Sequence, residues 1–287
     1  MIKVLFLILN FKTYSDTIRV TNELLQTDRK DFKILIVDNA SPNESYEEIF
    51  KTFVKNELVE VILSPENGGY AKGNNLGLRY AKKYNPEYVC IMNNDVHFSW
   101  DTIDAMCEIY ESLEKPALIS PIQINPDGSK LSFAEFKVPD LIYDIRMNTL
   151  FFQPKRHLYV SNTNFANVQK VGYLPGALLF TKYTVFEMLG FFDESTFLFC
   201  EERFIGKTVA DAGLNNYIIT DLTYLHEHSK TIKNEASEKR QKRWIHEGRL
   251  KYHARYSKCP FVAKALLNLA FYLHEFELSF ISFLRKK

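Results

Sequence analysis

The sequence lacks any stretch of 18 or more uncharged apolar residues, so no part of it is a candidate for a membrane-spanning helix. It is also poor in cysteine, and its four cysteines are far apart, without the C-x-x-C spacing of metal fingers. They are Cys90, Cys107, Cys200 and Cys259. This pattern favours a reducing compartment, with buried or inert thiols. The apolar run after Met1 ends at Asn10 without a small-residue cleavage site, so we interpret it as a buried strand and not as a signal peptide.

Two phosphate-binding motifs are also absent. The chain has neither a G-x-x-x-x-G-K-[ST] loop nor a G-x-G-x-x-G segment. In particular, Leu9-Asn10-Phe11-Lys12, which follows the first apolar run, contains no glycine. This absence argues against a nicotinamide dehydrogenase and against a nucleotidyltransferase, which needs a glycine-rich pyrophosphate loop at that point.

What is present suits one large α/β domain with an appendage, because the chain has 287 residues, 46% apolar and 25% charged. The net charge of +1 hides an asymmetry: residues 229–287 carry 14 Lys and Arg against 5 Asp and Glu. A basic tail on an acidic body favours an anionic partner such as a membrane surface, a lipid phosphate or nucleic acid. An ordinary solvated helix face remains the alternative.

The first 120 residues alternate between strand-like and helix-like patterns. Buried strands are predicted at Val4–Leu9, Phe32–Val37, Leu58–Leu63 and Tyr88–Met92. The intervening helices are predicted from Ser15 or Asp16 to Gln26, from Ser41 to Lys55, from Tyr70 to Tyr84, and from Ser99 to Leu113. This order predicts a Rossmann-like, doubly wound, mostly parallel sheet. Ligands bind beyond the carboxyl ends of such strands, where the sequence has Asn10, Asp38-Asn39, Ser64 to Asn67, and Asn93 to Asp95.

The second half of the chain is less regular. Residues 121–170 are predicted to form loops and short strands, and order returns at Val171–Phe180. The remaining elements are expected to be helices at Thr184–Leu189 and Glu201–Ala212, a strand at Tyr217–Thr220, and helices at Asn234–Tyr256 and Pro260–Leu284. We expect one domain at 1–228, with one half at 1–120 and the other at 121–228. A basic, amphipathic helical extension follows at 229–287.

Two segments at the predicted sheet edge have both functional and structural interpretations. The carboxylate of Asp38 is placed to accept hydrogen bonds from a base or ribose, or else it forms an Asx turn that caps the next helix. The segment Asn67-Gly68-Gly69-Tyr70-Ala71-Lys72-Gly73-Asn74 has two glycines before a helix. Such glycines let the backbone approach an anionic ligand at the helix N-terminus, or they simply form a turn.

Three further groups of residues are candidates for metal binding and acid–base chemistry. Asp95 in Met92-Asn93-Asn94-Asp95-Val96 offers the hard oxygen ligand that Mg²⁺ or Mn²⁺ takes beside substrate phosphates. Glu201-Glu202 opens a helix, where the pair either complements the helix dipole or has a raised pKa suited to a general base. His226-Glu227-His228 follows a short strand and has the spacing of metal or phosphate ligands.

Taken together and in order, these motifs resemble the family 2 glycosyltransferases with a GT-A fold, particularly the bacterial rhamnosyltransferase-like branch. The resemblance covers about residues 2–230. It rests on Ile8-Leu9-Asn10-Phe11, Val37-Asp38-Asn39-Ala40-Ser41, Glu66 to Gly77, Met92-Asn93-Asn94-Asp95-Val96, Leu174-Pro175-Gly176-Ala177-Leu178-Leu179, Gly190-Phe191-Phe192-Asp193-Glu194, Glu201-Glu202 and His226.

The resemblance implies a role for each matching position. The nucleotide sugar would be bound by Asn10, Asp38, Asn67, Gly68, Gly69, Lys72, Asn74, Asn94 and Gly176. Asp95 and His226 would hold Mn²⁺ or Mg²⁺ against the diphosphate, and Glu202, with Glu201 second, would be the catalytic base. Two departures weaken the assignment of the base: the pair is Glu-Glu where relatives have Glu-Asp, and Phe204 stands where they often have Asp.

The resemblance implies an inverting, metal-dependent hexosyltransferase of the cytoplasm that acts in bacterial surface polysaccharide synthesis. Residues 1–228 would be its catalytic domain, with a nucleotide-binding half at 1–120 and an acceptor half at 121–228. Its expected partners are a dTDP- or UDP-linked sugar and a glycan or lipid-linked saccharide acceptor, without nucleic acid. A nucleotide-sugar-binding partner subunit without transfer activity is the alternative. Residues 229–287 are expected either to lie on the inner face of the plasma membrane or to form a helical hairpin that packs on the catalytic domain or makes a homodimer.

Overall fold

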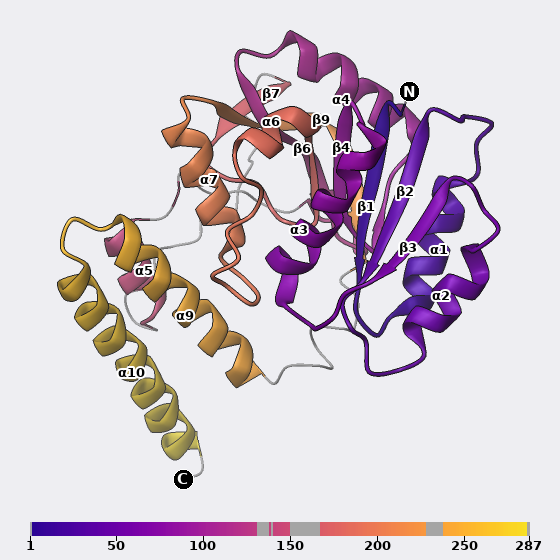
Figure 1. The fold of residues 1–287 in the computed structure, drawn as a ribbon. Helices are drawn as coiled ribbons and strands as arrows, with labels where there is room; N and C mark the ends of the chain where they lie inside the picture. Colours follow the sequence, from indigo (N-terminus) through magenta and orange to yellow (C-terminus); the bar gives the residue numbers. More distant parts are fainter. Residues whose placement is uncertain (1, 131–137, 139, 150–166, 228–237, 286–287) are drawn as a thin grey trace.

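The structure is a computed structural model that describes residues 2–130, 138, 140–149, 167–227 and 238–285. Its described part contains one mixed sheet in the order β3-β2-β1-β4-β8-β6-β9-β5, with β7 paired to β9. The first four strands in chain order are parallel neighbours: β1 (Val4–Asn10), β2 (Phe32–Asp38), β3 (Val59–Leu63) and β4 (Tyr88–Asn93). The fold expected from the sequence, a doubly wound and mostly parallel sheet followed by C-terminal helices, is therefore confirmed (Figure 1).

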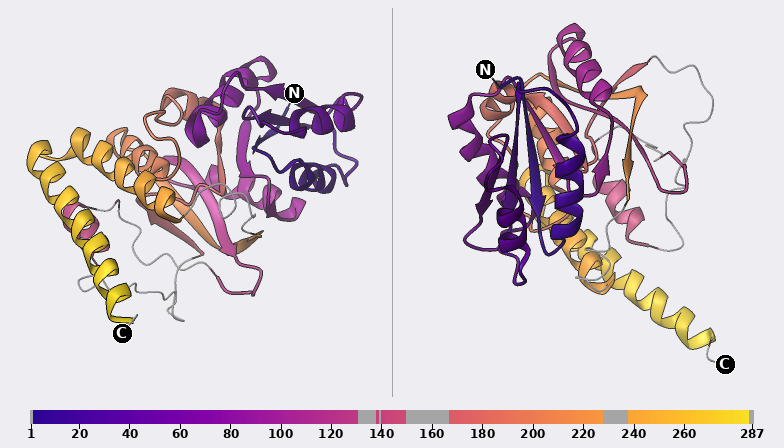
Figure 2. Two further views of the ribbon diagram at one scale, coloured as in Figure 1. Left: turned by 90° about the horizontal axis from the view of Figure 1, so that it is seen from below. Right: turned by 90° about the vertical axis from the view of Figure 1, so that its right-hand side faces the viewer.

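The continuous apolar strands form because both faces of the sheet are covered. In β1, Val4, Phe6 and Ile8 point to one face, and Leu5 and Leu7 point to the other. The first face packs on α1 (Tyr14–Leu24), α2 (Ser45–Phe53) and α4 (Trp100–Ser112). The second packs on α3 (Gly69–Ala81), α6 (Tyr183–Met188) and α7 (Glu201–Asp211). The helices are thus sorted to opposite sides of the sheet, as Figure 2 shows for α1 and α3.

The second half of the sheet differs in detail from the sequence prediction. It contains β5 (Val96–His97), β6 (Pro116–Ile124), β7 (Val168–Val171), β8 (Leu178–Lys182) and β9 (Asn215–His226). The strand β6 extends into a region expected to be irregular, and β9 is much longer than the predicted Tyr217–Thr220. The segment Val171–Phe180 comprises the end of β7, a turn and the start of β8. The division at residues 120 and 121 falls within β6, so the two predicted halves share one sheet.

Three more helices complete the described chain: α5 (Leu141–Met147), α9 (Glu238–Tyr256) and α10 (Pro260–Arg285), together with a short 3₁₀ turn at Lys82–Tyr84. Helix α5 was not predicted. The pair α9 and α10 confirms the two expected C-terminal helices, although the predicted start of α9 at Asn234 and the boundary at 228 lie outside the described residues. Within the described chain, no helix combines the length and the hydropathy needed to cross a bilayer.

The N-terminus of α3 is locked against the segment that leads into α7. The Tyr70 amide donates to the carbonyl oxygen of Phe197 at 2.9 Å. A Cβ added at Gly69 would lie 1.9 Å from that oxygen, and Gly69 has a φ of +83°. Gly69 is therefore required by a close contact between two backbone segments of the same chain. The sequence suggested that the backbone at this glycine approaches a ligand.

We predict that Gly69→Ala costs much more folding stability than Gly128→Ala. Both glycines have positive φ, but an added Cβ at Gly128 meets nothing within 4 Å. The strain at Gly128 alone is worth about 1 kcal/mol, whereas Gly69→Ala must also separate two backbone segments. Urea unfolding followed by circular dichroism measures both losses, and equal losses would contradict the proposed contact.

Candidate active site

The carboxyl edge of the parallel strands holds a connected set of buried polar side chains. The register aligns Asn10 at the end of β1 with Asp38 at the end of β2. Asn10 donates to the Asp38 carboxylate at 2.6 Å and accepts from Thr17 of α1 at 2.7 Å. Asn94, after β4, donates to Thr17 at 2.9 Å. Four elements are thus joined at the floor of the predicted donor site.

Asp38 also makes the local turn that the sequence allowed as its structural role. Its carboxylate accepts from the Ser41 amide and from the Ser41 hydroxyl, both at 2.8 Å, and Asp38 is fully buried. The side chain therefore organises the β2–α2 turn and is held by Asn10 on the other side. Four acceptor positions on a carboxylate leave one beyond these three contacts.

The glycine-rich segment supplies a second wall next to this floor. Asn39 donates to the Asn67 side chain at 3.0 Å and to the Gly69 carbonyl at 3.1 Å. Asn74, which is almost fully buried, donates to the Tyr70 carbonyl, and its Oδ1 is buried without a hydrogen-bond partner in the described residues. By contrast, Lys72 is exposed and pairs with Glu66. Asn67 and Asn74 are thus held in the wall, while Lys72 stands at its rim.

The two predicted metal ligands meet although they are far apart in the sequence. Asp95 occupies the turn between β4 and β5, and the pairing of Val96 with His226 brings β9 alongside. The His226 Nε2 atom lies 3.2 Å from Asp95 Oδ1, and Asp95 is 3% exposed. Adjacent ligands of an octahedral Mg²⁺ or Mn²⁺ ion are spaced by about 3 Å. The spacing and the oxygen–nitrogen donor set therefore fit such an ion.

The residues around His226 fix the orientation of its ring relative to Asp95. Gln123 donates through Nε2 to Asn125 at 3.2 Å, and its Oε1 accepts from the Tyr224 hydroxyl at 3.3 Å. The same oxygen lies 3.2 Å from His226 Nδ1, so Nδ1 carries the proton. Nε2 is therefore the ring nitrogen that faces the Asp95 carboxylate. A histidine held in this way has the support that metal-binding histidines usually have.

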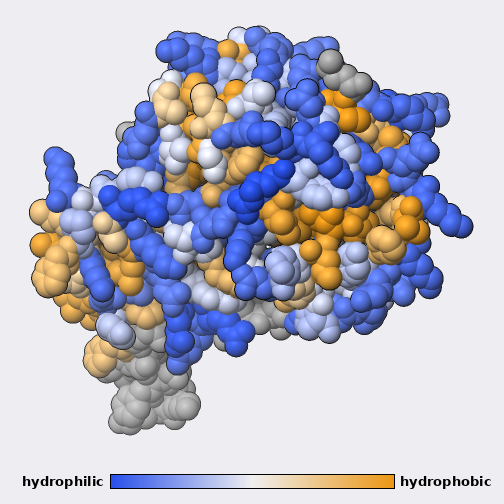
Figure 3. All heavy atoms as spheres, in the orientation of Figure 1, coloured by the Kyte–Doolittle hydropathy of each residue, from blue (hydrophilic) through white to orange (hydrophobic). Residues whose placement is uncertain are grey.

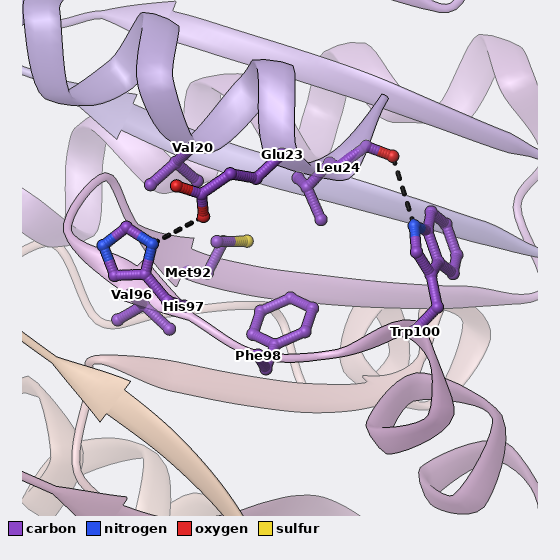
Figure 4. Close-up of a pocket in the computed structure, with 8 residues that line it drawn as sticks. All are labelled: Val20, Glu23, Leu24, Met92, Val96, His97, Phe98 and Trp100. Carbon is purple, nitrogen blue, oxygen red and sulfur yellow. Dashed lines mark hydrogen bonds and ion pairs between the residues drawn. The ribbon is translucent and has the colours of Figure 1, made fainter. Parts of the chain in front are cut away.

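The short strand β5 is supported from behind by a second group of side chains. His97 Nδ1 lies 2.6 Å from the Glu23 carboxylate, and both residues line a cavity of about 20 Å³ with Met92, Val96 and Phe98 (Figure 4). Glu227, next to His226, accepts from Arg19 at 3.0 Å. Contacts to α1 therefore hold both β5 and the end of β9. The third member of the motif, His228, lies outside the described residues.

Glu201 and Glu202 begin α7 in different environments. Glu201 is 3% exposed, and its Oε1 is buried without a hydrogen-bond partner in the described part of the chain. Burial, together with the neighbouring Glu202 carboxylate, raises the pKa of Glu201 to about 8. Glu202 is only half-buried; burial also raises its pKa, but the Arg203 charge and a hydrogen bond from the Gly176 backbone act against this.

Gly176 links Glu202 to the edge of the sheet. A Cβ added at Gly176 would lie 3.2 Å from Glu202 Oε1, and the Gly176 carbonyl accepts from the Tyr70 hydroxyl at 2.6 Å. The next residue, Ala177, accepts through its carbonyl from the Asn93 amide at 2.9 Å. Glu202 is therefore at the carboxyl end of β4, on the edge that carries Asp95. Tyr70 belongs to this group but had not been singled out, because an aromatic in a turn carries no specific sequence signal.

The approach to α7 is strained and tightly packed. Phe199 and Cys200 both have positive φ, at 71° and 73°, which is unusual for two successive residues other than glycine. Helix α9 covers this turn, since a Cβ on Gly248 would lie 2.8 Å from the Cys200 side chain. Phe204, the residue that departs from the expected pattern, is fully buried and contacts Tyr252 of α9. Its phenyl ring thus serves the packing of α9.

A buried ionic cluster, which the sequence did not indicate, joins α7 to α5 and α9. Asp144 of α5 is fully buried and contacts Arg203 at 2.5 Å, His253 at 2.8 Å and Arg249 at 3.3 Å. Burial opposes its ionisation, but the His253 hydrogen bond and the Arg203 charge hold the pKa of Asp144 below its usual value. The residue next to Glu202 is therefore anchored to the C-terminal helices.

Comparison with known proteins adds a family to this geometry. The model of glycosyl transferase family 2 matches residues 7–163. The low-salt glycan biosynthesis hexosyltransferase Agl10 of Haloferax volcanii is 27% identical over 59% of the chain and 50% of its own length. An N-acetylglucosaminyl-diphospho-decaprenol L-rhamnosyltransferase of Mycobacterium tuberculosis is 26% identical over 49% of the chain and 47% of its own length. The chain thus spans about half the length of these relatives.

Solved structures with low sequence identity show the same fold. GalNAc-T7 with UDP, GalNAc and Mn²⁺ superposes with a TM-score of 0.61 at 12% identity, over 94% of the chain and 55% of that protein. The mannosyltransferase PcManGT of Pyrobaculum calidifontis, in complex with GDP-Man and Mn²⁺, superposes with a TM-score of 0.59 at 15% identity, over 95% of the chain and 70% of that protein. The GT-A fold expected from the sequence is therefore confirmed.

The buried Glu201 carboxyl predicts a distinctive pH dependence of stability. Because its pKa rises from 4.5 to about 8 on folding, the folded state binds the extra proton between these values. Stability from this group is thus present below pH 4.5 and is lost as the pH rises toward 8. Glu201→Gln should flatten this part of the profile and raise the unfolding free energy at pH 7 by up to about 3 kcal/mol. Urea unfolding between pH 5 and 8 tests it; an unchanged slope would contradict the assigned burial.

Proposed function

The chain belongs to glycosyl transferase family 2, and from this premise we propose that it is an inverting hexosyltransferase. In this proposal it moves a sugar from a nucleoside diphosphate, UDP- or dTDP-linked, to a saccharide or a lipid-linked saccharide. The observation that carries the proposal is the convergence of Asp95, His226 and Glu202 on one sheet edge. The relatives named above are a hexosyltransferase and a rhamnosyltransferase, which supports sugar transfer as the reaction class.

The donor is proposed to lie across the carboxyl ends of β1, β2 and β4. Asp38, held by Asn10 and Ser41, would accept one hydrogen bond from the base or ribose. Asn67, Gly68, Gly69 and Asn74 would form the adjoining wall, with Lys72 at the rim and Asn94 and Gly176 next to the diphosphate. The floor needs little rearrangement for binding, because its side chains already hold one another.

Mn²⁺ or Mg²⁺, held by Asp95 and His226, would supply charge neutralisation for the diphosphate leaving group. Gln123 keeps the His226 ring oriented for this role. Both proteins of the same fold named above were solved with Mn²⁺.

Glu202 is the proposed general base, and its neighbour Glu201 is proposed to stay protonated. With a pKa of about 8, Glu201 is mostly neutral at pH 7, so one carboxylate of the pair is free to accept a proton. Glu202 would take the proton of an acceptor hydroxyl, whose oxygen then forms a bond to the anomeric carbon as the bond to the diphosphate breaks. Attack from the face opposite the leaving group inverts the anomeric configuration.

The proposed setting is the cytoplasm, at the inner face of the plasma membrane, in bacterial surface polysaccharide synthesis. All four cysteines are free, and three are buried, which is typical of proteins in a reducing compartment. A partner subunit that binds nucleotide sugar without transferring it is the competing proposal. Transfer by the isolated chain would exclude that alternative.

We predict that Glu202→Gln lowers the transfer rate by about 10²-fold or more and leaves donor affinity nearly unchanged, because the amide cannot accept the proton. The matched control is Glu201→Gln, which should retain most of the activity since Glu201 is already neutral. Product formation from a panel of UDP- and dTDP-sugars measures the rate, and calorimetry measures nucleotide binding. Near-normal turnover of Glu202→Gln would contradict the assignment of Glu202 as the general base.

We also predict that Asp95→Asn weakens Mn²⁺-dependent binding of UDP or dTDP by at least about 100-fold, and that His226→Gln weakens it by about tenfold or more. Asp16→Asn is the control for charge alone, because burial and the nearby Asp95 charge raise the pKa of Asp16, which places this second carboxylate close to Asp95. Calorimetry with and without Mn²⁺ separates the effects. If Asp16→Asn lost as much affinity as Asp95→Asn, the result would indicate general electrostatics and not metal ligation.

A further inference from the structure

The outermost helix of the C-terminal hairpin packs on the protein along only one side. In α10, Ala263, Leu267 and Ala270 are buried. The neighbouring strip of the helix meets α9, where His246 stacks on Phe271 at 4.1 Å and contacts Asn268 at 2.9 Å. The hairpin expected from the sequence therefore forms and is anchored. The opposite side of α10 is exposed.

That outer side carries a continuous set of large apolar side chains, which we call the α10 outer face. Its members with their exposed fractions are Phe261 85%, Val262 51%, Leu266 40%, Leu269 66%, Tyr272 68%, Leu273 43% and Phe276 66%. At 3.6 residues per turn, these positions and the exposed Ala265 span an arc of about 140° that contains no charged residue. Figure 3 shows the N-terminal part of this face as orange spheres at the lower left.

Exposed basic side chains lie at the N-terminal end of the α10 outer face, which we call its basic border: Lys258 precedes the helix, and Lys264 lies about 60° around the helix from the arc. The charged α10 positions closest to the arc further along the helix are Glu275 and Glu277. Lys239, Arg240 and Arg243 are exposed at the start of α9. Residues 229–287 as a whole carry 14 Lys and Arg against 5 Asp and Glu. An apolar stripe with cations at one end, on an extension with an excess of positive charge, matches a surface with anionic headgroups above a hydrocarbon layer.

The same charge argues against a second copy as the occupant. A symmetric contact would place the α10 outer face of one copy against the identical face of the other. Each copy would bring to the contact an extension with 14 Lys and Arg against 5 Asp and Glu, a net charge of +9, and like net charges brought together at an interface oppose association.

We propose that the α10 outer face lies in the headgroup region of an anionic lipid bilayer and holds the protein at the membrane surface. The helix would lie parallel to the bilayer plane, with its apolar arc inserted and its basic border among the headgroups. Helix α10 packs on α9. Helix α9 packs on α7 through Tyr252 and Phe204, and Asp144 of α5 bridges the same two helices. Two helix layers, on the order of 20 Å, would thus separate the bilayer from Glu202.

This placement extends the proposed function, and only the inference about the acceptor rests on that function. If the enzyme transfers sugar, its acceptor would be lipid-linked and long enough to reach from the bilayer to Glu202. The bilayer contact itself needs neither donor nor acceptor, so it can be tested apart from catalysis.

The test is flotation of the full chain with vesicles of phosphatidylcholine alone or with about one third phosphatidylglycerol. We expect binding that favours the anionic vesicles and weakens at high salt. Leu269→Gln with Phe276→Gln should lower binding at least about tenfold, because two inserted side chains are lost. Phe50→Gln with Val54→Gln is the matched control: it removes two exposed apolar side chains from α2 and should leave binding unchanged.

A second pair of variants tests the basic border. Lys258→Gln with Lys264→Gln should lower binding to anionic vesicles by about tenfold and spare the neutral ones. Lys51→Gln with Lys55→Gln, at the end of α2 and just beyond it, should change neither. Circular dichroism and a thermal melt check that each variant folds, and Glu202→Gln should float like the parent chain whether or not transfer is detected.

Two outcomes would overturn the proposal. The first is a folded parent chain that fails to float with anionic vesicles. The second is a parent dimer in light scattering that Leu269→Gln with Phe276→Gln converts to monomer without any effect on flotation, which would assign the α10 outer face to self-association.

Discussion

The candidate site depends on the register of three parallel strands. Because β1 aligns residue by residue with β2 and with β4, the polar residues that end each strand arrive at one level of the sheet edge. Asn10 is then close enough to donate to Asp38 and to accept from Thr17, which in turn accepts from Asn94. Buried polar groups are tolerated only when they are paired, so the network fixes the floor before any ligand arrives. A slip of one residue in any strand would turn these side chains to the wrong face.

Much of the first half could be predicted from the sequence because its signals are local. A strand covered on both faces is almost continuously apolar, and β1, β2 and β4 each end in a polar residue. The strand β6 gave no such signal. It begins at Pro116 and contains Pro121, and its pairing partners β8 and β9 are more than fifty residues away in the chain. Helix α5, of seven residues, was too short to show a periodicity.

The motifs identified candidate residues, but not what holds them. Asp95 and His226 were expected to share an ion, and β5 pairs with β9 to bring them together. The support from Gln123 could not be predicted, because it depends on β6 lying beside β9. Gly69 was expected at the donor site, and its backbone also lies against the Phe197 carbonyl, a contact that the sequence did not indicate. A sequence shows where backbone must come close, but it does not say which partner comes close.

The Asp144 cluster connects the C-terminal helix α9 to the candidate active site through Arg203. A buried ion pair adds little net stability over apolar packing, yet removing one partner leaves an uncompensated charge and costs about 3–5 kcal/mol. Such a cluster therefore specifies one arrangement of helices more than it strengthens the fold. Here the arrangement joins Arg203, beside Glu202, to Arg249 and His253 of α9. A shift of the hairpin would have to move α7 or break this cluster. Whatever the α10 outer face binds is thus mechanically connected to the proposed catalytic base.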